Sequence, residues 1–210
     1  MNRTRILILA ILLTLSAASI SWGLDYVIDA EHSSVLLNIK HLGISTVTGR
    51  FEKFTGSFGF DPDDVRAAIA STTIDAASIN TNVPFRDKHL RSSDFLDVEK
   101  YPEITFIGRK VTEVDQKNHR FKLFGDLTIH GVTKPVTLDV QLGGSARDPD
   151  GKQRIGFTAT TRINRRDYGL VWNRIIEGGG LLVGKEVPVV GEQVWITLDV
   201  EGVAPTPTGN

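Results

Sequence analysis

The sequence predicts an all-β fold: an eight-stranded antiparallel barrel with one short helix near residues 84–92. Apolar and polar residues alternate along many short segments, which is typical of strands that bury one face. Short turn signals separate these segments, and short turns join antiparallel neighbours. Eight such segments are enough to close a barrel. They span residues 34–42, 46–60, 69–76, 104–114, 120–130, 135–146, 154–164 and 194–202.

The first 23 residues have the composition of a secretory signal peptide. Arg3 and Arg5 precede an apolar run at residues 6–15, and small residues follow. The run is shorter than the ~20 residues that span a bilayer, and no second run follows, so we expect no stable membrane insertion. We therefore expect a periplasmic or secreted protein that is cleaved after Gly23 or after Ala18.

Composition favours one domain, residues 24–203, followed by a disordered tail at residues 204–210. The hydrophobic fraction of 40 % is enough for a sizeable core, and the absence of cysteine means that no disulfide supports it. The 24 basic and 25 acidic residues form no long run of one sign. This balance argues against nucleic acid and anionic membrane surfaces as partners.

In the first predicted strand, the alternation identifies an inward-facing row. Val35, Leu37 and Ile39 form this row, and His41 continues it. We therefore expect His41 to point into the interior, either as a hydrogen-bonded core residue or as a ligand contact.

The helix lies in a turn-rich insertion at residues 84–106, and such irregular segments on a β scaffold often bind ligands or substrates. Asn82 is expected to cap the helix and Pro84 to occupy its first turn. Asp87 and His89 are two residues apart, so they point to different faces and cannot form a catalytic dyad. Asp87 and Arg91 have the spacing of a surface ion pair.

Two interpretations of this insertion remain open. In the first, it plugs one end of the barrel with the apolar side chains of Phe85, Leu90, Phe95 and Leu96. In the second, it forms a polar mouth that contacts a ligand head group through Arg86 and His89.

Residues 165–187 form a second irregular region, which combines apolar residues such as Trp172 with three consecutive glycines at residues 178–180. Such a segment is either a loop that folds over a pocket as a lid or two strands joined by a turn.

No catalytic or metal site is expected. The chain has neither a GxSxG elbow nor a glycine-rich phosphate loop. Its histidines form none of the close pairs typical of zinc sites; they are His32, His41, His89, His119 and His130. We therefore expect no cofactor.

The interior of an eight-stranded barrel is either filled by side chains or holds one small ligand. Gly56, Gly108 and Gly125 lie within predicted strands and are expected to leave room there. An apolar lining of this kind would suit a long, apolar ligand.

Four blocks of the sequence resemble the YceI-like family, exported proteins of lipocalin-like barrel shape associated with polyisoprenoid binding. The blocks read DAEHSSVLLNIKHLGISTVTGRF, RDKHLRSSDFLDVEKYPEITF, GDLTIHGVTKPV and INRRDYGL. The resemblance covers residues 26–203. It implies a periplasmic barrel whose tunnel takes up a long isoprenoid chain, such as that of a quinone or a polyprenyl phosphate. Arg165, Arg166 and Asp167 are expected to fasten the second irregular region to the barrel rather than to contact a phosphate.

We therefore expect a non-enzymatic carrier with an isoprenoid lipid in the barrel interior. Arg86 and His89 are candidates for contacts with the head group. The expected tunnel wall consists of Val35, Leu37, Ile39, His41, Phe58, Phe106, Leu123, Leu138, Val140, Phe157 and Trp172.

Two other functions remain open: an enzyme that modifies a lipid head group at the barrel mouth, and a solid barrel that acts as a stress-response interaction module. The sequence also leaves open whether the protein forms a homodimer.

Overall fold

The computed structural model describes residues 24–177 and 186–205. The predicted signal peptide, residues 178–185 and the last five residues lie outside this part. The described strands are β1 (Leu24–Ile28), β2 (Ser34–His41), β3 (Ser45–Phe51), β4 (Phe54–Phe60), β5 (Ile69–Asp75), β6 (Ile79–Asn80), β7 (Glu103–Asp115), β8 (Arg120–Ile129), β9 (Val132–Arg147), β10 (Gln153–Asn164), β11 (Ile175–Glu177), β12 (Glu186–Pro188) and β13 (Val190–Val203). One α-helix, α1 (Pro84–Arg91), and three short 3₁₀ helices, η1 (Val65–Ala67), η2 (Ala76–Ser78) and η3 (Arg165–Tyr168), complete the fold.

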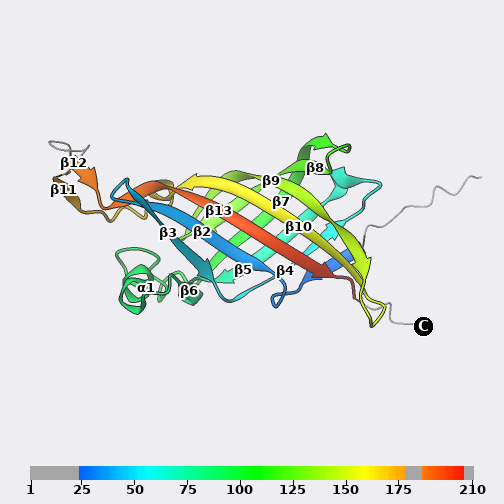
Figure 1. Ribbon diagram of the computed structural model, residues 1–210, viewed down its shortest axis with the longest axis horizontal. Helices are drawn as coiled ribbons and strands as arrows, with labels where there is room; N and C mark the ends of the chain where they lie inside the picture. The colour runs from blue at the N-terminus through cyan, green and yellow to red at the C-terminus, as the bar shows by residue number, and fades with distance from the viewer. Residues whose placement is uncertain (1–23, 178–185, 206–210) are drawn as a thin grey trace, which may run out of the picture.

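Eight of these strands close an antiparallel barrel, which confirms the predicted fold class. Their order is β1-β4-β5-β7-β8-β9-β10-β13, and β13 returns to β1. The closing pairs are Val27 with Val203 and Ile28 with Gly202. Figure 1 shows an elongated barrel with α1, β11 and β12 gathered at one end.

The closing strands differ from the predicted set in three places. β2, which was predicted at residues 34–42 as one of the eight, pairs with β13 but lies outside the closing ring. The predicted strand at residues 46–60 is two strands, because the chain breaks at Glu52 and Lys53. β3 pairs with β2 and β6, whereas β4 pairs with β1 and β5. β1 was not predicted, and it supplies the eighth closing strand.

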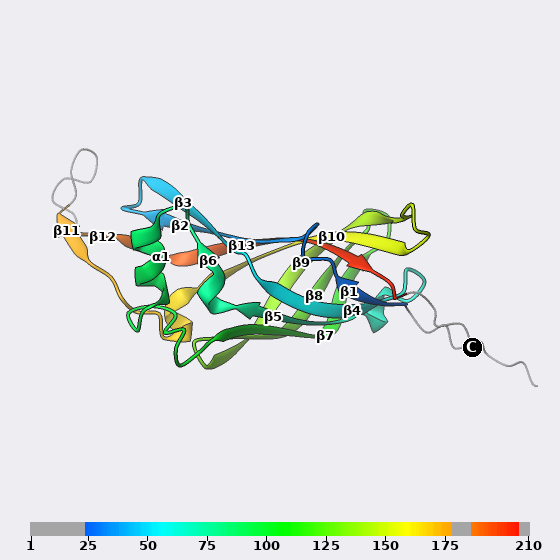
Figure 2. The ribbon, with the colours of Figure 1, turned by 90° about the horizontal axis from the view of Figure 1, so that it is seen from below.

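The two ends of the barrel are built differently. β13 pairs with β1 at Gly202 and Val203 but with β2 between Val190 and Asp199, so β2, β3 and β6 extend the sheet at the far end. Figure 2 shows α1 beside β6 at that end. We call this the helix end, and the end with β1 and the β9–β10 turn the packed end.

Aromatic side chains fill the packed end. Phe60 lies at its centre, with its ring centroid 5.0 Å from that of Phe157 and 6.2 Å from that of Phe121. Phe58 stacks on Tyr26 at 5.2 Å and meets Phe157 edge to face. Because these rings occupy the interior, this half of the barrel is a conventional core.

The glycines expected to leave room in the strands do not do so. A Cβ atom at Gly125 would lie 2.6 Å from the ring of Phe106, and one at Gly108 would lie 3.0 Å from Leu123. At Gly56 the nearest atom is the backbone oxygen of Ser71, at 2.5 Å. Each glycine allows a close approach of neighbouring protein atoms.

Helix α1 begins as predicted with Pro84 in its first turn. The N-cap residue is Val83 rather than Asn82, and it forms no side-chain cap. Asn82 instead adopts a φ of 61°, a left-handed conformation that asparagine tolerates well. It therefore turns the chain into the helix without capping it.

The predicted ion pair between Asp87 and Arg91 is wrong. Asp87 is buried and accepts hydrogen bonds from the backbone N–H of Thr81 (2.9 Å) and from its hydroxyl (2.6 Å). Arg91 donates to the carbonyl oxygens of Ala77 and Ile79. Both charged residues thus attach the helix to the segment at residues 77–81.

Ala204 is buried and its N–H donates to the carbonyl of Gln153, so the predicted tail does not begin at this residue.

Within the described residues, no helix is long and apolar enough to cross a membrane.

Candidate ligand-binding cavity

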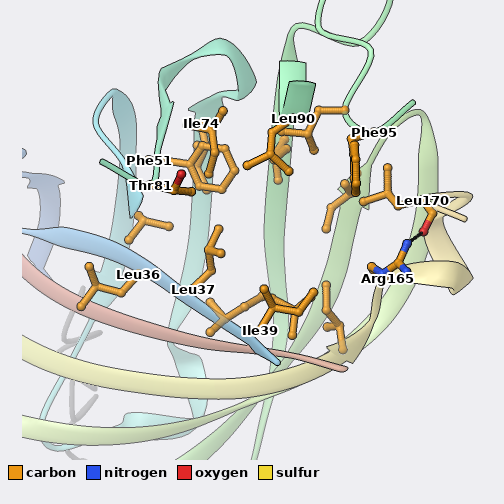
Figure 3. Close-up of a pocket in the computed structure, with 18 of the residues that line it drawn as sticks. Leu36, Leu37, Ile39, Phe51, Ile74, Thr81, Leu90, Phe95, Arg165 and Leu170 are labelled. Atoms are coloured by element: carbon orange, nitrogen blue, oxygen red, sulfur yellow. Dashed lines mark hydrogen bonds between the residues drawn. The ribbon is translucent and has the colours of Figure 1, made fainter. Parts of the chain in front are cut away.

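The helix end contains an apolar cavity of about 440 Å³, within the usual size range of small-ligand pockets. Its wall combines the inward faces of β2, β7 to β10 and β13 with side chains of α1. Figure 3 shows Leu37 and Ile39 on one side and Ile74 and Leu90 on the other. The aromatic side chains of the packed end do not reach this level, which leaves the space open.

Partial exposure of inward-facing residues locates the open space. Leu37, Val194, Ile196 and Leu198 face the interior and pack against the core, yet they are only partly buried. Trp195, which lies between two of them, points outward and is exposed. An apolar ligand in the cavity could cover the side-chain surface that these inward-facing residues still expose.

Seven of the eleven predicted wall residues line this cavity: Val35, Leu37, Ile39, His41, Phe106, Leu138 and Trp172. The other four do not. Phe58 and Phe157 belong to the aromatic packing of the packed end, and Leu123 and Val140 are buried in the core. These four residues face the interior, as predicted, but at a level where side chains fill it.

Both predicted head-group residues line the cavity. Arg86 donates from Nε to the hydroxyl of Thr81 (2.7 Å) and from Nη2 to its carbonyl (2.8 Å). His89 Nε2 lies 2.8 Å from a carboxylate oxygen of Asp94, and its ring contacts Trp172 at 4.8 Å. The His89–Asp94 contact was not predicted, because it depends on the chain reversal after the helix.

The insertion at residues 84–106 combines features of the plug and of the mouth. Leu90, Phe95 and Leu96 pack inward as a plug would. Phe85 is 84 % exposed at the edge of the cavity, so its predicted inward position is wrong.

The second irregular region contains a strand pair in its described part. Ile175 to Glu177 pair with Glu186 to Pro188, beyond the helix end of the barrel (Figures 1 and 2). The tip at residues 178–185, on which the lid interpretation depends, lies outside the described residues.

Of the three residues expected to fasten this region to the barrel, Arg165 and Arg166 contact β13, whereas the side chain of Asp167 forms no hydrogen bond or ion pair with another described residue. Arg165 Nε donates to the carbonyl of Gly191 (2.8 Å), and Arg166 pairs with Glu192 (3.3 Å). Arg165 also lines the cavity. The sequence contained a signal for this position: Thr161 and Ile163 face the cavity, and Arg165 continues their alternation.

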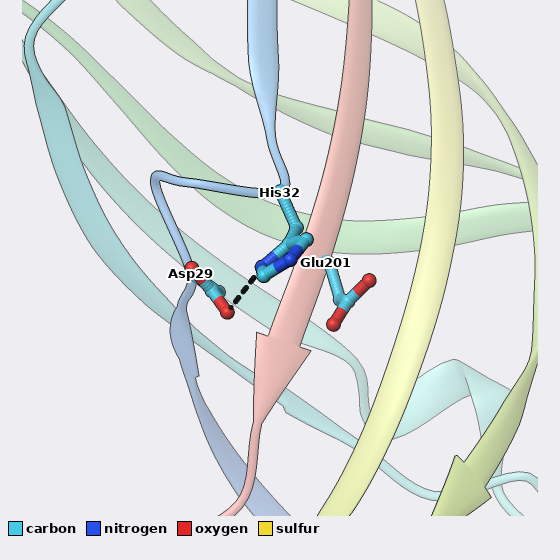
Figure 4. A group of neighbouring side chains, drawn as sticks. All are labelled: Asp29, His32 and Glu201. Atoms are coloured by element: carbon cyan, nitrogen blue, oxygen red, sulfur yellow. Dashed lines mark hydrogen bonds and ion pairs between the residues drawn. The ribbon is translucent and has the colours of Figure 1, made fainter. Parts of the chain in front are cut away.

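A cluster of possible metal ligands lies at the packed end. One ligand atom from each of Asp29, His32 and Glu201 lies within 4.8 Å of the others (Figure 4). Arg154 already forms ion pairs with Asp29, Asp148 and Glu201. The guanidinium group of Arg154 thus supplies positive charge that balances these carboxylates. We therefore assign the cluster to closure of the barrel, where it joins β1, β10 and β13.

This network should make stability depend on acidity. The hydrogen bond from Arg154 is the main cause that lowers the pKa of Asp29 from 3.8 to about 2, and His32 adds to it. A carboxylate with a lowered folded-state pKa stabilises the fold above its unfolded-state pKa, and this contribution is lost as pH falls through the folded-state value. We expect the free energy of unfolding to fall between about pH 4 and pH 2, and this fall to be shallower in Arg154→Gln.

Urea unfolding at several pH values measures this dependence. Arg109→Gln, which removes a more exposed arginine paired with Asp126, is the control and should leave the slope unchanged. Parallel pH curves for the wild type and Arg154→Gln would contradict the role of the network.

Comparisons with known proteins agree on one family. Residues 26–201 match the model of the YceI-like domain. A UPF0312 protein of Vibrio cholerae serotype O1 is 40 % identical over 171 residues, which cover 80 % of this chain and 87 % of that protein. The chain belongs to the YceI-like family.

Solved structures support the fold of this YceI-like protein. The Campylobacter jejuni YCEI protein is 32 % identical, with a TM-score of 0.64 over 80 % of this chain and 90 % of the other. A polyisoprenoid binding domain from Saccharophagus degradans has a TM-score of 0.57 at 19 % identity and covers 87 % of this chain and 99 % of its own. The latter likeness concerns the fold alone. The YceI-like match spans both ends of the barrel, so the cavity lies within it.

Proposed function

We propose that this YceI-like protein is an exported carrier that binds the chain of a long isoprenoid lipid in the helix-end cavity. The observation that carries the proposal is the apolar cavity itself, whose inward rows on β2 and β13 retain uncovered surface. Covering apolar surface contributes ~25 cal/mol per Å², so a lipid chain could bind with few polar contacts. The shared fold of the Saccharophagus degradans domain supports an isoprenoid as the chain.

Organic extraction of the purified protein, followed by mass spectrometry, tests this proposal. We expect an isoprenoid lipid in the extract, and we expect the delipidated protein to take up quinones or polyprenols saturably. An empty extract together with no saturable binding of either lipid class would overturn it. Sequencing the N-terminus of protein recovered from the periplasm or the medium tests export, for which we expect a start at residue 24 or 19.

A second candidate function is an enzyme that acts on a lipid head group. The supporting observation is the contact between His89 and Asp94 at the cavity wall, an arrangement found in general bases. If the carrier function is correct, bound lipid is recovered chemically unchanged after long incubation. Conversion of the lipid by the wild type that His89→Gln abolishes would favour the enzyme.

A further inference from the structure

Exposed apolar side chains gather at the helix end of the barrel. In the described part of the chain, eleven large hydrophobic side chains are exposed, and the other five lie singly on β1, β5, β7, β8 and β13. Single exposed apolar residues are ordinary, whereas a group of them at one place marks an interaction surface. The six at the helix end, which we call the apolar rim, are Ile44, Val83, Phe85, Val171, Ile175 and Ile176.

The apolar rim surrounds the open end of the cavity. Phe85 belongs to both, because it lines the cavity and is 84 % exposed, so the cavity reaches the surface beside it. Ile44 lies in the turn between β2 and β3, and Val171 follows η3. Figures 1 and 2 show that α1, β11 and the β2–β3 turn project at this end as separate segments.

Basic side chains accompany the apolar rim. They are Lys40 on β2, Lys88 on α1 and Arg174 before β11, and all three are exposed. No carboxylate in the described part of the chain forms an ion pair with any of them. Lysine and arginine side chains beside apolar ones can contact lipid phosphate groups while the apolar side chains enter the layer below.

We propose that the apolar rim docks onto a lipid bilayer and holds the open end of the cavity against its surface. The inference rests on the proposed function, because an isoprenoid lipid resides in a membrane and its apolar chain is unfavourable in water. Docking would let the chain pass between bilayer and cavity without crossing water.

A bilayer fits the apolar rim better than a second copy of the chain does. The rim residues sit on separate projecting segments, which can enter a head-group layer individually, whereas the core of a protein interface is one closely packed patch. Glu177 and Glu186 pair across β11 and β12, so the helix end carries charges of both signs. Docking therefore depends on apolar insertion and needs no anionic lipid.

Fluorescent labels test which end of the mature protein meets the bilayer. The chain contains no cysteine, so Ile44→Cys and Ile69→Cys each provide a single site for an environment-sensitive label. Ile69 is also exposed but lies at the packed end, opposite Gly59, which pairs with Asp25 of β1. With phosphatidylcholine vesicles that carry brominated acyl chains, we expect quenching of the label at residue 44 only. Equal quenching at both positions, or none at either, would overturn the docking.

Serine variants measure how much the apolar rim contributes. Ile44 and Val171 do not line the cavity, so Ile44→Ser and Val171→Ser should leave binding of farnesol in the absence of vesicles unchanged. In flotation with phosphatidylcholine vesicles, the double variant should dock roughly 10- to 100-fold more weakly, the equivalent of exposing a large apolar side chain. Ile69→Ser is the matched control and should dock as the wild type. Wild-type docking by the double variant would overturn the rim as the contact.

The same measurements separate the docking from the carrier function. Farnesol binding without any vesicle contact would overturn the docking and leave the carrier function intact. Quenching at residue 44 without binding of farnesol or a polyprenol would overturn the carrier function and leave the docking surface. A change in the emission of this label that grows with protein concentration in the absence of vesicles would assign the apolar rim to contacts between copies and overturn the bilayer as its partner.

Discussion

Replacing Phe60 by alanine is expected to lower the free energy of unfolding by about 3–5 kcal/mol and to leave lipid binding unchanged. Phe60 is 4 % exposed, and its ring packs against those of Phe121 and Phe157 from two other strands. Since the closed barrel holds these strands apart, their side chains cannot collapse into the space that the ring leaves. Urea unfolding of the wild type and the variant measures the loss.

Phe124→Ala is the matched control for this prediction. Phe124 lies on β8, as Phe121 does, but it is 39 % exposed on the outer face. We expect its replacement to change the free energy of unfolding by less than about 1 kcal/mol. An equal loss at Phe124 and Phe60, or weaker lipid binding after Phe60→Ala at a temperature where the variant is folded, would contradict the separation of packed end and cavity.

The alternation of residue types predicted which face of a strand points inward, because side chains in a strand repeat with a period of two. The same alternation also indicates the interruption that separates β3 from β4. Gly49 and Phe51 are buried at odd positions, whereas Phe54 and Phe60 are buried at even positions. A continuous strand would keep one parity, so this change required an interruption between Phe51 and Phe54.

The level of each residue along the barrel could not be predicted in this way. Phe60, Phe121 and Phe157 meet because the registers of β4, β8 and β10 bring them to one height. The relative height of two residues depends on the registers of all the strand pairs between them, and these registers follow from the tilt and stagger of the strands. No single segment of the sequence encodes them. For this reason the alternation predicts the inward face of Phe58 and Phe157 but not their position at the packed end.

Replacing Ile196 by tryptophan is expected to block the cavity and to weaken isoprenoid binding by roughly 50- to 1,000-fold. Ile196 lines the cavity from β13 and is only partly buried, so a larger side chain can extend into the open space. An indole that excludes three to five carbons of the lipid removes about 2.4–4 kcal/mol at ~0.8 kcal/mol per carbon, which corresponds to this loss of affinity. Titration of the delipidated variant with a polyprenol measures the effect.

Stability separates blocking from misfolding. Because the indole enters space that is already open, we expect the free energy of unfolding to change by no more than about 1–2 kcal/mol. Asp199→Trp places the same side chain on the same strand at an exposed, outward position and should leave binding unchanged. If Ile196→Trp folded stably and still bound the polyprenol as the wild type does, the lipid would have to bind outside the helix-end cavity. Together with Phe60→Ala, this variant would show whether one half of the barrel provides stability and the other half binding.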